Sequence, residues 1–307
     1  MPKPASSPRK PASKPDAVTV VGIRLTHPDK VLWTDQGLSK RELAAYYEAI
    51  AEPMLPHVAE RPLSLVRCPA GTGERCFFQK HPFAGLNEAV ARVSVPGDEA
   101  ALMVRDLPGL VALVQSGVLE VHPWGARVED VDRPDRMIFD FDPAPDVPFA
   151  AVMAAAREVR ERLAARDLRS FVKTTGGKGL HVVVPLAPGP SWAQVKGFAD
   201  AMAEAMSADE PGGYITSAGK ADRAGRIFID VLRNAREATA VAPFSPRARP
   251  GATVSTPLAW DELDGALRPA ALTVKTVPAR LAALSADPWA GFFDTRQKIP
   301  MGTRQES

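Results

Sequence analysis

Apolar and acidic residues alternate along residues 137–143, whose sequence is MIFDFDP. Successive side chains of a β-strand point to opposite faces, so Phe139 and Phe141 share one face while Asp140 and Asp142 share the other. The pattern predicts a strand whose phenylalanine face packs on a core and whose acidic face is open. Neighbouring carboxylates repel each other unless a cation lies between them. The strand therefore carries either a divalent metal site or an acidic edge that is only solvated.

Hydrophobic periodicity predicts further elements. Ser39 and Glu42 have the spacing of a helix capping box, and apolar residues then recur at helical intervals until Pro53 and Pro56, which should end or kink the helix. Residues 107–119 are strongly apolar and fit either a helix or a buried strand. Further strands are predicted at 17–23, 62–68, 169–174, 180–186 and 226–232, and further helices at 148–165, 191–207, 260–267 and 278–284.

Around the acidic strand the predicted order is strand, helix, strand, strand, helix, strand, which resembles a split βαβ arrangement. We expect an α+β protein with one domain over residues 17–307. Its N-terminal α/β subregion would cover about 17–130 and its catalytic core about 131–290. Residues 1–16 are rich in Pro, Ser and Lys, which predicts a disordered basic tail.

Composition excludes several classes of protein. With 45% hydrophobic and 24% charged residues, the 307-residue chain is typical of soluble globular proteins. The sequence has no apolar run of about 18 residues and no apolar signal core, which predicts neither a membrane span nor secretion. Cys68 and Cys76 have no second pair, which indicates neither a zinc site nor a disulfide framework. These features favour a reducing, cytoplasmic setting.

A third aspartate joins the first two from another predicted strand. Asp230 comes near the end of the apolar strand predicted at 226–232, and Asp140 likewise follows apolar residues of the acidic strand. Three such carboxylates can hold two divalent ions, which stabilise the attacking and leaving oxygens of an in-line displacement. The alternative is a carboxylate that only forms an ion pair with Arg226 or Arg233.

A glycine-rich segment with the sequence KTTGGKGLH lies at residues 173–181, between two predicted strands. Glycines let backbone N–H groups face an anion, and Thr175, Lys178 and His181 add side-chain donors for phosphate oxygens. The spacing is not that of a Walker A motif, which opens a helix. The alternative is an ordinary glycine hairpin with a surface lysine.

Basic residues gather between Thr216 and Arg249, where seven Lys and Arg residues face three Asp and Glu residues. The local charge is +4 in a chain of net charge +2. Prolines stiffen the loop that carries Arg247 and Arg249, which would position both guanidinium groups on phosphate; a solvated basic loop is the alternative. Anionic ligands for two metal ions and cationic donors for a triphosphate together favour phosphoryl transfer.

The combined motifs closely resemble the polymerase domain of bacterial ligase D, the end-joining branch of the archaeo-eukaryotic primase superfamily. The resemblance covers about residues 18 to 290 and rests on DKVL at 29–32, FFQK at 77–80, EVHPW at 120–124, DFD at 140–142, GGKGLH at 176–181, FID at 228–230 and APFSPRAR at 242–249. It implies a primase-polymerase fold, with an RRM-like, mainly antiparallel catalytic sheet flanked by helices. It also implies template-dependent primer extension at DNA double-strand breaks, by gap filling and end extension, with a preference for ribonucleotides and for Mn²⁺ over Mg²⁺.

The resemblance also implies roles for individual residues. Asp140 and Asp142 would hold both metal ions and Asp230 the catalytic one. The incoming NTP or dNTP would be bound by Thr175, Lys178, His181, Arg247, Arg249 and Ser245, with His122 at its sugar. DNA would be bound by Lys30, Lys40, Arg67, Phe77, Phe78 and Arg223. Among these, the two lysines would take the 5′-phosphate downstream of a gap, a phenylalanine would stack on a template base, and Arg223 would lie near the primer end.

Expected partners are gapped duplexes and DNA ends with a 5′-phosphate, together with Ku and a DNA ligase, in the nucleoid of the cytoplasm. Thr175 departs from the serine of many relatives but keeps the hydroxyl. The sequence contains no K-x-D-G ligase motif and no second His-rich nuclease segment, so the chain would be a stand-alone polymerase or an excised domain. Two alternatives remain open: a primase-type polymerase that starts chains de novo, and a non-catalytic module that bridges DNA ends.

Overall fold

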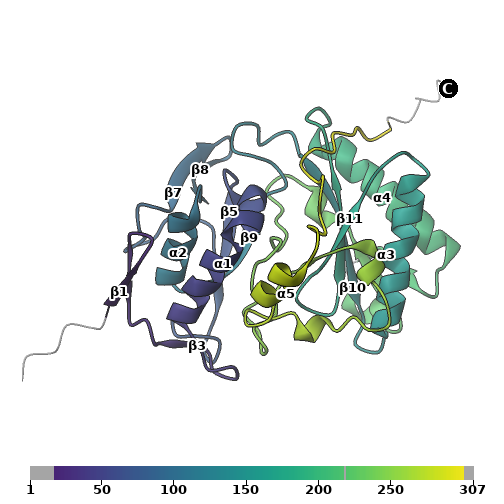
Figure 1. The fold of residues 1–307 in the computed structure, drawn as a ribbon. Coiled ribbons are helices and arrows are strands. Elements are labelled where there is room, and N and C mark those ends of the chain that lie inside the picture. Colours follow the sequence, from purple (N-terminus) through teal and green to yellow (C-terminus); the bar gives the residue numbers. More distant parts are fainter. Residues whose placement is uncertain (1–16, 218, 301–307) are drawn as a thin grey trace, which may run out of the picture.

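Two larger β-sheets organise the part of the chain that the computed structural model describes, residues 17–217 and 219–300 (Figure 1). The first half of the chain forms a five-stranded sheet and the second half a six-stranded sheet. The predicted N-terminal tail, residues 1–16, lies outside the described residues. The predicted α+β class is confirmed, with sheets that are mostly antiparallel.

The helices are α1 (Lys40–Val58), α2 (Leu107–Gln115), α3 (Phe149–Ala164), α4 (Trp192–Asp209) and α5 (Val277–Ala283). The strands of the first half are β1 (Ala17–Val20), β2 (Ile23–Thr26), β3 (Val31–Trp33), β4 (Leu38–Ser39), β5 (Leu63–Arg67), β6 (Phe77–Gln79), β7 (Ala91–Val95), β8 (Asp98–Met103) and β9 (Val118–Pro123). The strands of the second half are β10 (Arg136–Pro143), β11 (Phe171–Thr174), β12 (Leu180–Pro185), β13 (Tyr214–Ile215), β14 (Ile227–Asp230) and β15 (Pro257–Leu258).

The six-stranded sheet has the order β13-β14-β10-β12-β11-β15, with the acidic strand β10 between β14 and β12. Both neighbours of β10 are antiparallel to it. Phe139 and Phe141 are fully buried in one core with Val152 and Val159 of α3 and Val195 of α4. The helices therefore cover the phenylalanine face, as the alternation predicts, and no helix of the described residues covers the aspartate face, where Asp142 is exposed and Asp140 is largely buried. The split βαβ arrangement is likewise present.

In the first half, α1 and α2 pack together beside the strands that pair with β5. The ambiguous segment 107–119 divides into helix α2 and the start of β9, because Gly117 turns the chain between them with φ of 73°. The hairpin of β7 and β8 was not predicted, and the helix expected at 260–267 is only a short 3₁₀ turn at Trp260–Glu262. Among the described residues, no helix has both the length and the apolarity needed to cross a membrane.

Helix α1 continues through both of its prolines to Val58, so of the two predicted outcomes, an end or a kink at Pro53 and Pro56, the end is wrong. Proline removes a helix hydrogen bond to the carbonyl four residues earlier. The two carbonyls affected belong to Ala49 and Glu52, which are exposed, so water can satisfy them. Burial of the last turn, including Met54 and Val58, holds the helix together.

Cys68 and Cys76 form a disulfide with Cα atoms 4.4 Å apart, which corrects the prediction that they indicate none. Arg67 of β5 lies directly opposite Phe77 of β6. The residue after one and the residue before the other are consequently brought face to face. The antiparallel pairing of two short strands makes the bond possible. The number of cysteines alone does not predict this pairing.

His57, in the last turn of α1, is surrounded by three aromatic rings. Its ring centroid lies 5.3 Å from that of Trp289, 5.4 Å from Phe292 and 4.7 Å from Phe293. Burial lowers the pKa of His57 well below its ordinary value, and the positive charges of Arg136, Arg61 and Lys173 add to this against the single opposing charge of Asp135.

We therefore expect the protein to lose stability between about pH 7 and pH 5. The unfolded chain takes up a proton on this histidine near pH 6.5, whereas the folded state keeps it neutral, so stability is present above that pH and falls below it. The loss at pH 5 is about 2 kcal/mol. Urea unfolding at several pH values should show that the free energy of unfolding falls less steeply with decreasing pH in His57→Leu than in the wild type. His81→Gln, a change at an exposed histidine, is the control, and an unchanged slope in His57→Leu would contradict the assignment.

Candidate active site

Four polar side chains form a row across the open face of the six-stranded sheet. Asp140 of β10 lies opposite both Asp230 of β14 and His181 of β12, and His181 lies opposite Lys173 of β11. Side chains of directly paired residues in antiparallel strands point to the same face. The row therefore lies on the side of the sheet away from α3 and α4.

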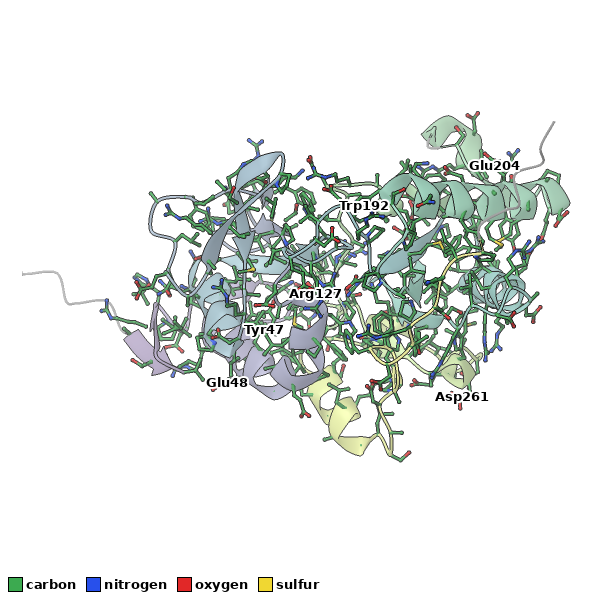
Figure 2. All side chains as sticks on the ribbon, turned by 90° about the horizontal axis from the view of Figure 1, so that it is seen from above. Tyr47, Glu48, Arg127, Trp192, Glu204 and Asp261 are labelled. Atoms are coloured by element: carbon green, nitrogen blue, oxygen red, sulfur yellow. A yellow bond between two sulfur atoms is a disulfide. The ribbon has the colours of Figure 1, made fainter. Side chains whose placement is uncertain are left out.

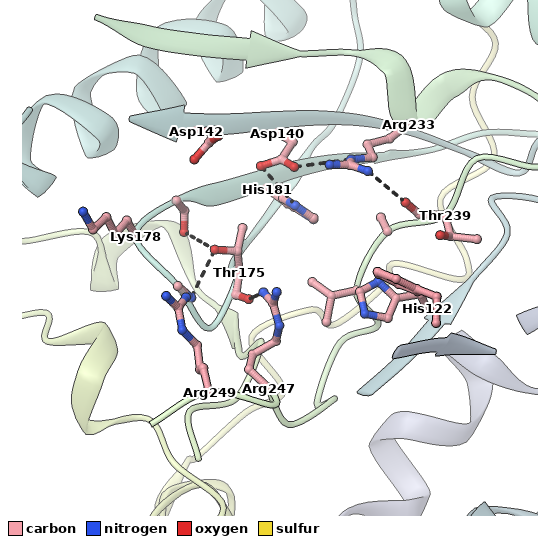
Figure 3. Close-up of a pocket in the computed structure, with 15 residues that line it drawn as sticks. His122, Asp140, Asp142, Thr175, Lys178, His181, Arg233, Thr239, Arg247 and Arg249 are labelled. Carbon is pink, nitrogen blue, oxygen red and sulfur yellow. Dashed lines mark hydrogen bonds and ion pairs between the residues drawn. The ribbon is translucent and has the colours of Figure 1, made fainter. Parts of the chain in front are cut away.

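Two members of the row, Asp140 and His181, line a cavity of about 400 Å³ (Figure 3). The cavity brings together residues from the middle of β10, from the glycine-rich loop after β11, from the end of β9 and from the loop after β14. The predicted site residues that line it are Phe78, His122, Asp140, Asp142, Thr175, Lys178, His181, Arg247 and Arg249.

Each of the three aspartates contacts a cationic or imidazole group. Arg233 lies between Asp140 and Asp230, with Nε 3.4 Å from Asp140 Oδ2 and Nη2 3.1 Å from Asp230 Oδ2. His181 Nε2 is 3.3 Å from Asp140 Oδ1. On the neighbouring same-face position, Asp142 Oδ2 is 3.0 Å from Arg223 Nη1. The pairing of Asp230 with Arg233, left open as an alternative by the sequence, is present.

The pKa values of the two facing carboxyl groups, those of Asp140 and Asp230, are shifted in opposite directions. Burial raises the pKa of Asp140, but His181, Arg233 and Lys173 outweigh burial and lower this pKa to about 2. Burial raises the pKa of Asp230, and the negative charge of Asp140 adds to the rise. Two carboxylates at close range repel each other, so the one with fewer stabilising cations has the higher pKa.

The donor set fits a divalent cation. Asp140 and Asp230 already hold the positive guanidinium of Arg233 between them, and carboxylate oxygens are the ligands that Mg²⁺ and Mn²⁺ prefer. With the arginines in these positions, no three Asp, Glu, His or Cys side chains of the described residues form a ready-made metal cluster. A bound ion would take over the contacts that Arg233 and Arg223 now make.

The glycine-rich loop needs its glycines because it packs tightly. A Cβ at Gly179 would collide with the carbonyl oxygen of Phe141, and one at Gly176 would lie 2.6 Å from Arg247 Cγ. The Thr175 hydroxyl donates to Gly179 O at 3.1 Å and accepts from Gly177 N at 3.2 Å. The hairpin is thus closed by Thr175, and Lys178 is exposed at its tip.

Glu120 ties the arginine loop to His122 in the wall of the cavity. Its buried carboxylate contacts His122 Nε2 at 2.8 Å and Arg247 Nε at 3.0 Å, and accepts from Ala248 N at 2.7 Å. Arg247 also donates to Thr175 O. Burial raises the pKa of Glu120, but His122 and Arg247 outweigh burial and lower it to about 2. The carboxylate therefore stays ionised at neutral pH.

Several predicted residues lie elsewhere. Ser245 is fully buried below the loop, where its hydroxyl accepts from Val121 N and donates to Pro246 O. Lys40 is also buried, and its ammonium donates to Thr26 O, Gln115 O and Gln115 Oε1. Lys30 is exposed, with its ammonium near Pro69 O.

The aromatic hairpin stands at the edge of the cavity. Phe78 is 65% exposed, and its ring centroid lies 5.7 Å from that of His122. Phe77 is 39% exposed and faces the guanidinium of Arg67, which also stacks on Phe83 at 3.6 Å. These surfaces are open for contact with a nucleic-acid base.

Sequence reasoning missed Glu120, Lys173 and Arg233 as site residues. Glu120 could have been found, because it lies two residues before His122 on one strand and must share its face. Lys173 lies in the same register as His181 only through the β11–β12 pairing. The position of Arg233 depends on the 3₁₀ turn after β14, and no local sequence pattern predicts this turn.

Comparison with known proteins gives consistent matches. The model of the LigD primase-polymerase domain family matches residues 39–289. The chain is 36% identical to the multifunctional non-homologous end joining protein LigD of Pseudomonas aeruginosa over 99% of its length, and 35% identical to that of Mycolicibacterium smegmatis over 78%. It spans about a third of these relatives, 37% and 32% of their lengths. The polymerase domain of Mycobacterium tuberculosis ligase D, solved in complex with DNA, superposes with a TM-score of 0.79 at 33% identity, covering 85% of this chain and 94% of that domain.

Proposed function

Because the chain belongs to the LigD primase-polymerase domain family, whose members are DNA-directed nucleotidyltransferases, we propose that it extends a primer strand on a template at DNA double-strand breaks. Gap filling and end extension, with ribonucleotides preferred, would be its reactions in non-homologous end joining. One observation carries the proposal: Asp140, which is paired with Asp230 on the next strand, lines the same cavity as Thr175, Lys178 and Arg247.

Asp140, Asp142 and Asp230 would hold two Mn²⁺ or Mg²⁺ ions, which when bound neutralise charge on the reacting phosphate and on the attacking 3′-oxygen. Around them, the protein's own groups bind and orient the nucleotide. Lys178 and Arg247 donate to the triphosphate, and the N–H groups of the glycine loop add further donors. The pyrophosphate leaves from this cationic side of the cavity.

His122 would face the nucleotide sugar. Glu120 accepts from His122 Nε2, which fixes the ring's orientation and leaves its other nitrogen for contacts at the sugar. Burial lowers the pKa of His122, so the ring is neutral, and with Nε2–H donated to Glu120 its other nitrogen can accept one hydrogen bond there. A 2′-hydroxyl would add a contact that a deoxynucleotide lacks. Phe78, beside His122, would stack on a template base.

The proposal is tested by extension of a 5′-phosphorylated gapped duplex, with NTP compared with dNTP and Mn²⁺ with Mg²⁺. We expect extension in the presence of either metal, with NTP and Mn²⁺ giving the higher rates. Dinucleotide synthesis on an unprimed strand would instead favour a primase that starts chains de novo. DNA binding without any extension would favour an end-bridging module.

Lys30→Ala should weaken binding only to DNA ends that bear a 5′-phosphate. The exposed ammonium of Lys30 lies beside His27, Pro28 and Asp29 on an open surface, where one phosphate contact is worth about tenfold in affinity. Anisotropy titrations with phosphorylated and unphosphorylated gapped duplexes measure the difference. Equal loss on both substrates would refute the specific role, and Arg24→Gln, at an exposed position of β2, serves as control.

The remaining parts of the proposal concern organisation. We propose that residues 17–307 act as one domain, with the two sheets on either side of the cavity. Because relatives of the chain are named as multifunctional end-joining proteins, we further propose that a DNA ligase activity and Ku act with it, in the nucleoid. Pull-down of purified Ku with and without a blunt duplex would test the second point.

A further inference from the structure

A second cavity, of about 270 Å³, lies at the other end of β10. The segment after β9, the end of β12 and residues 292–296 enclose it. Arg136 lines this cavity and Asp140 lines the first, and four strand residues span about 13 Å. Buried Ile138, Trp289 and Phe292 belong to an apolar cluster between them. The second cavity is therefore distinct from the candidate active site, and Figure 2 labels Arg127 of its wall between the two halves of the protein.

Positive charge exceeds negative charge around this cavity. One carboxylate, that of Asp135, contacts three guanidinium groups. Arg61 forms a two-pronged ion pair with it, with Nη1 3.0 Å from Oδ1. Arg136 Nε lies 3.0 Å from the same oxygen, and Arg127 Nε lies 3.8 Å from Oδ2. Arg61 and Arg136 are both buried, with 0% and 5% of their surface exposed.

Burial makes this excess costly. It lowers the pKa of Arg61 to about 10, and repulsion from Arg136 adds to the shift. The neighbouring His57 responds in the same sense, since three nearby cations lower its pKa and a single carboxylate opposes them. A buried group of charges with more cations than anions is stabilised by a further anion.

Hydrogen-bond donors are also left over. Arg136 Nη2 and Arg61 Nε are buried, and neither has a hydrogen-bond partner among the described residues. Buried donors are rarely left unpaired in folded proteins. Arg136 belongs to the cavity wall, so the cavity is the place from which an acceptor can reach this cluster.

The rim of the cavity combines charge with an aromatic surface. Arg133 and Arg296 add two cations, while Glu129 and Asp130 are exposed acids. Phe293 is 46% exposed beside them. The volume is below that of most small-molecule sites, about 300–1,000 Å³, and suits a single phosphate group better than a whole nucleotide.

We propose that this cavity binds a phosphate group, carried either by a free phosphate compound or by the backbone of a DNA strand. Guanidinium forks match two phosphate oxygens at once, and a phosphate here would accept from the more exposed guanidinium groups of the lining, those of Arg127, Arg133 and Arg296, while balancing the excess charge of the buried cluster. The site does not depend on the nucleotidyl-transfer proposal, because none of its arginines lines the catalytic cavity.

The first test titrates the chain with inorganic phosphate at constant ionic strength and with EDTA, and reads binding from thermal unfolding. All proteins carry Arg247→Gln, which weakens phosphate binding in the catalytic cavity. Adding Arg127→Gln with Arg296→Gln should weaken the remaining binding about tenfold. Adding Arg24→Gln with Arg92→Gln, two exposed positions away from the cavity, should not. Arg136→Lys, which keeps the charge but loses the fork, is a second variant, and unfolding in chloride alone verifies that each variant folds.

The second test distinguishes the sources of the phosphate. Anisotropy titrations with a single-stranded oligonucleotide at several salt concentrations compare the same variants. If the variants lose affinity for both phosphate and DNA, the cavity is assigned to a DNA strand. The slope of log K for DNA against log salt concentration should then be smaller in magnitude by about 0.7. Loss for phosphate alone assigns it to a free phosphate compound. Unchanged affinity for both ligands in Arg127→Gln with Arg296→Gln and in Arg136→Lys would overturn the proposal.

Discussion

Replacing Asp140 or Asp230 by alanine should abolish primer extension on a gapped duplex and leave DNA binding nearly intact. The two carboxylates face each other across β10 and β14, so each would supply a ligand that the other cannot replace. Removing metal-based stabilisation worth several kcal/mol slows a reaction by about a thousandfold. The residues proposed to bind DNA lie on other segments, and the loss of one acidic group would not remove any of their contacts to phosphate.

The measurement is the extension rate with saturating NTP and Mn²⁺, beside the affinity for the same duplex. Both aspartates are paired with Arg233, so alanine also leaves a guanidinium with one partner fewer. Asp140→Asn and Asp230→Asn keep the side-chain shape and separate this effect from loss of the charge. Asp200→Ala, which breaks an ion pair with Lys196 on α4, is the matched control. Extension by the Asp140 and Asp230 variants at the wild-type rate would contradict the assignment of these residues as metal ligands.

Local pattern was sufficient wherever one strand or helix decides its own faces. The alternation at 137–143 predicted both the strand and its open aspartate face, since a period of two allows no other arrangement of the phenylalanines. The capping box of Ser39 and Glu42 is present as predicted. The glycines at 176–179 also led to the correct loop, because only residues without a Cβ fit against Phe141 and Arg247.

Pattern failed where tertiary contacts outweigh local preference. Helix α1 passes two prolines because its last turn is buried. Lys40, expected at a DNA phosphate, lies inside the first half of the protein, where three oxygens of Thr26 and Gln115 receive its ammonium. Those oxygens belong to segments 14 and 75 residues away, so nothing near Lys40 in the sequence indicates them. Family motifs place a residue at a site without saying what its side chain contacts.

The arginine loop shows the same limit more strongly. It belongs to the second half of the chain, yet residues of the first half hold it. Tyr46 donates its hydroxyl to Phe244 O at 2.7 Å, and Trp33 Nε1 donates to Arg247 O at 3.0 Å. The prolines that suggested a stiff loop are thus only part of its rigidity. Trp33 lies on β3, which begins one residue after Lys30. The same strand therefore supports both the arginine loop proposed to bind the triphosphate and the surface proposed to bind the 5′-phosphate.

Glu120→Gln should raise the KM for nucleotide by about 10- to 100-fold, with a smaller effect on kcat. The carboxylate holds His122, Arg247 and the backbone of Ala248 through charge-assisted contacts, each of a kind worth about 1.5–3 kcal/mol. Glutamine keeps the shape but loses the charge, and its NH2 group must face either Ala248 N or the pair of His122 and Arg247. Arg247 would lose its ionic partner in either case, and the triphosphate would meet a loosened guanidinium.

A role in positioning predicts a second effect, which general destabilisation does not. Because the same carboxylate orients His122, the ratio of kcat/KM for NTP to that for dNTP should fall in Glu120→Gln, whereas partial unfolding would lower both values equally. Glu158→Gln is the matched control, since Glu158 binds Arg162 and Tyr214 far from the cavity, and it should leave KM and the ratio unchanged. Loss of a buried charge also predicts lower stability, by about 3–5 kcal/mol, so rates are compared below the unfolding transition. An unchanged ratio with a raised KM would confine Glu120 to the arginine loop, and unchanged values of both would show that neither His122 nor Arg247 needs it.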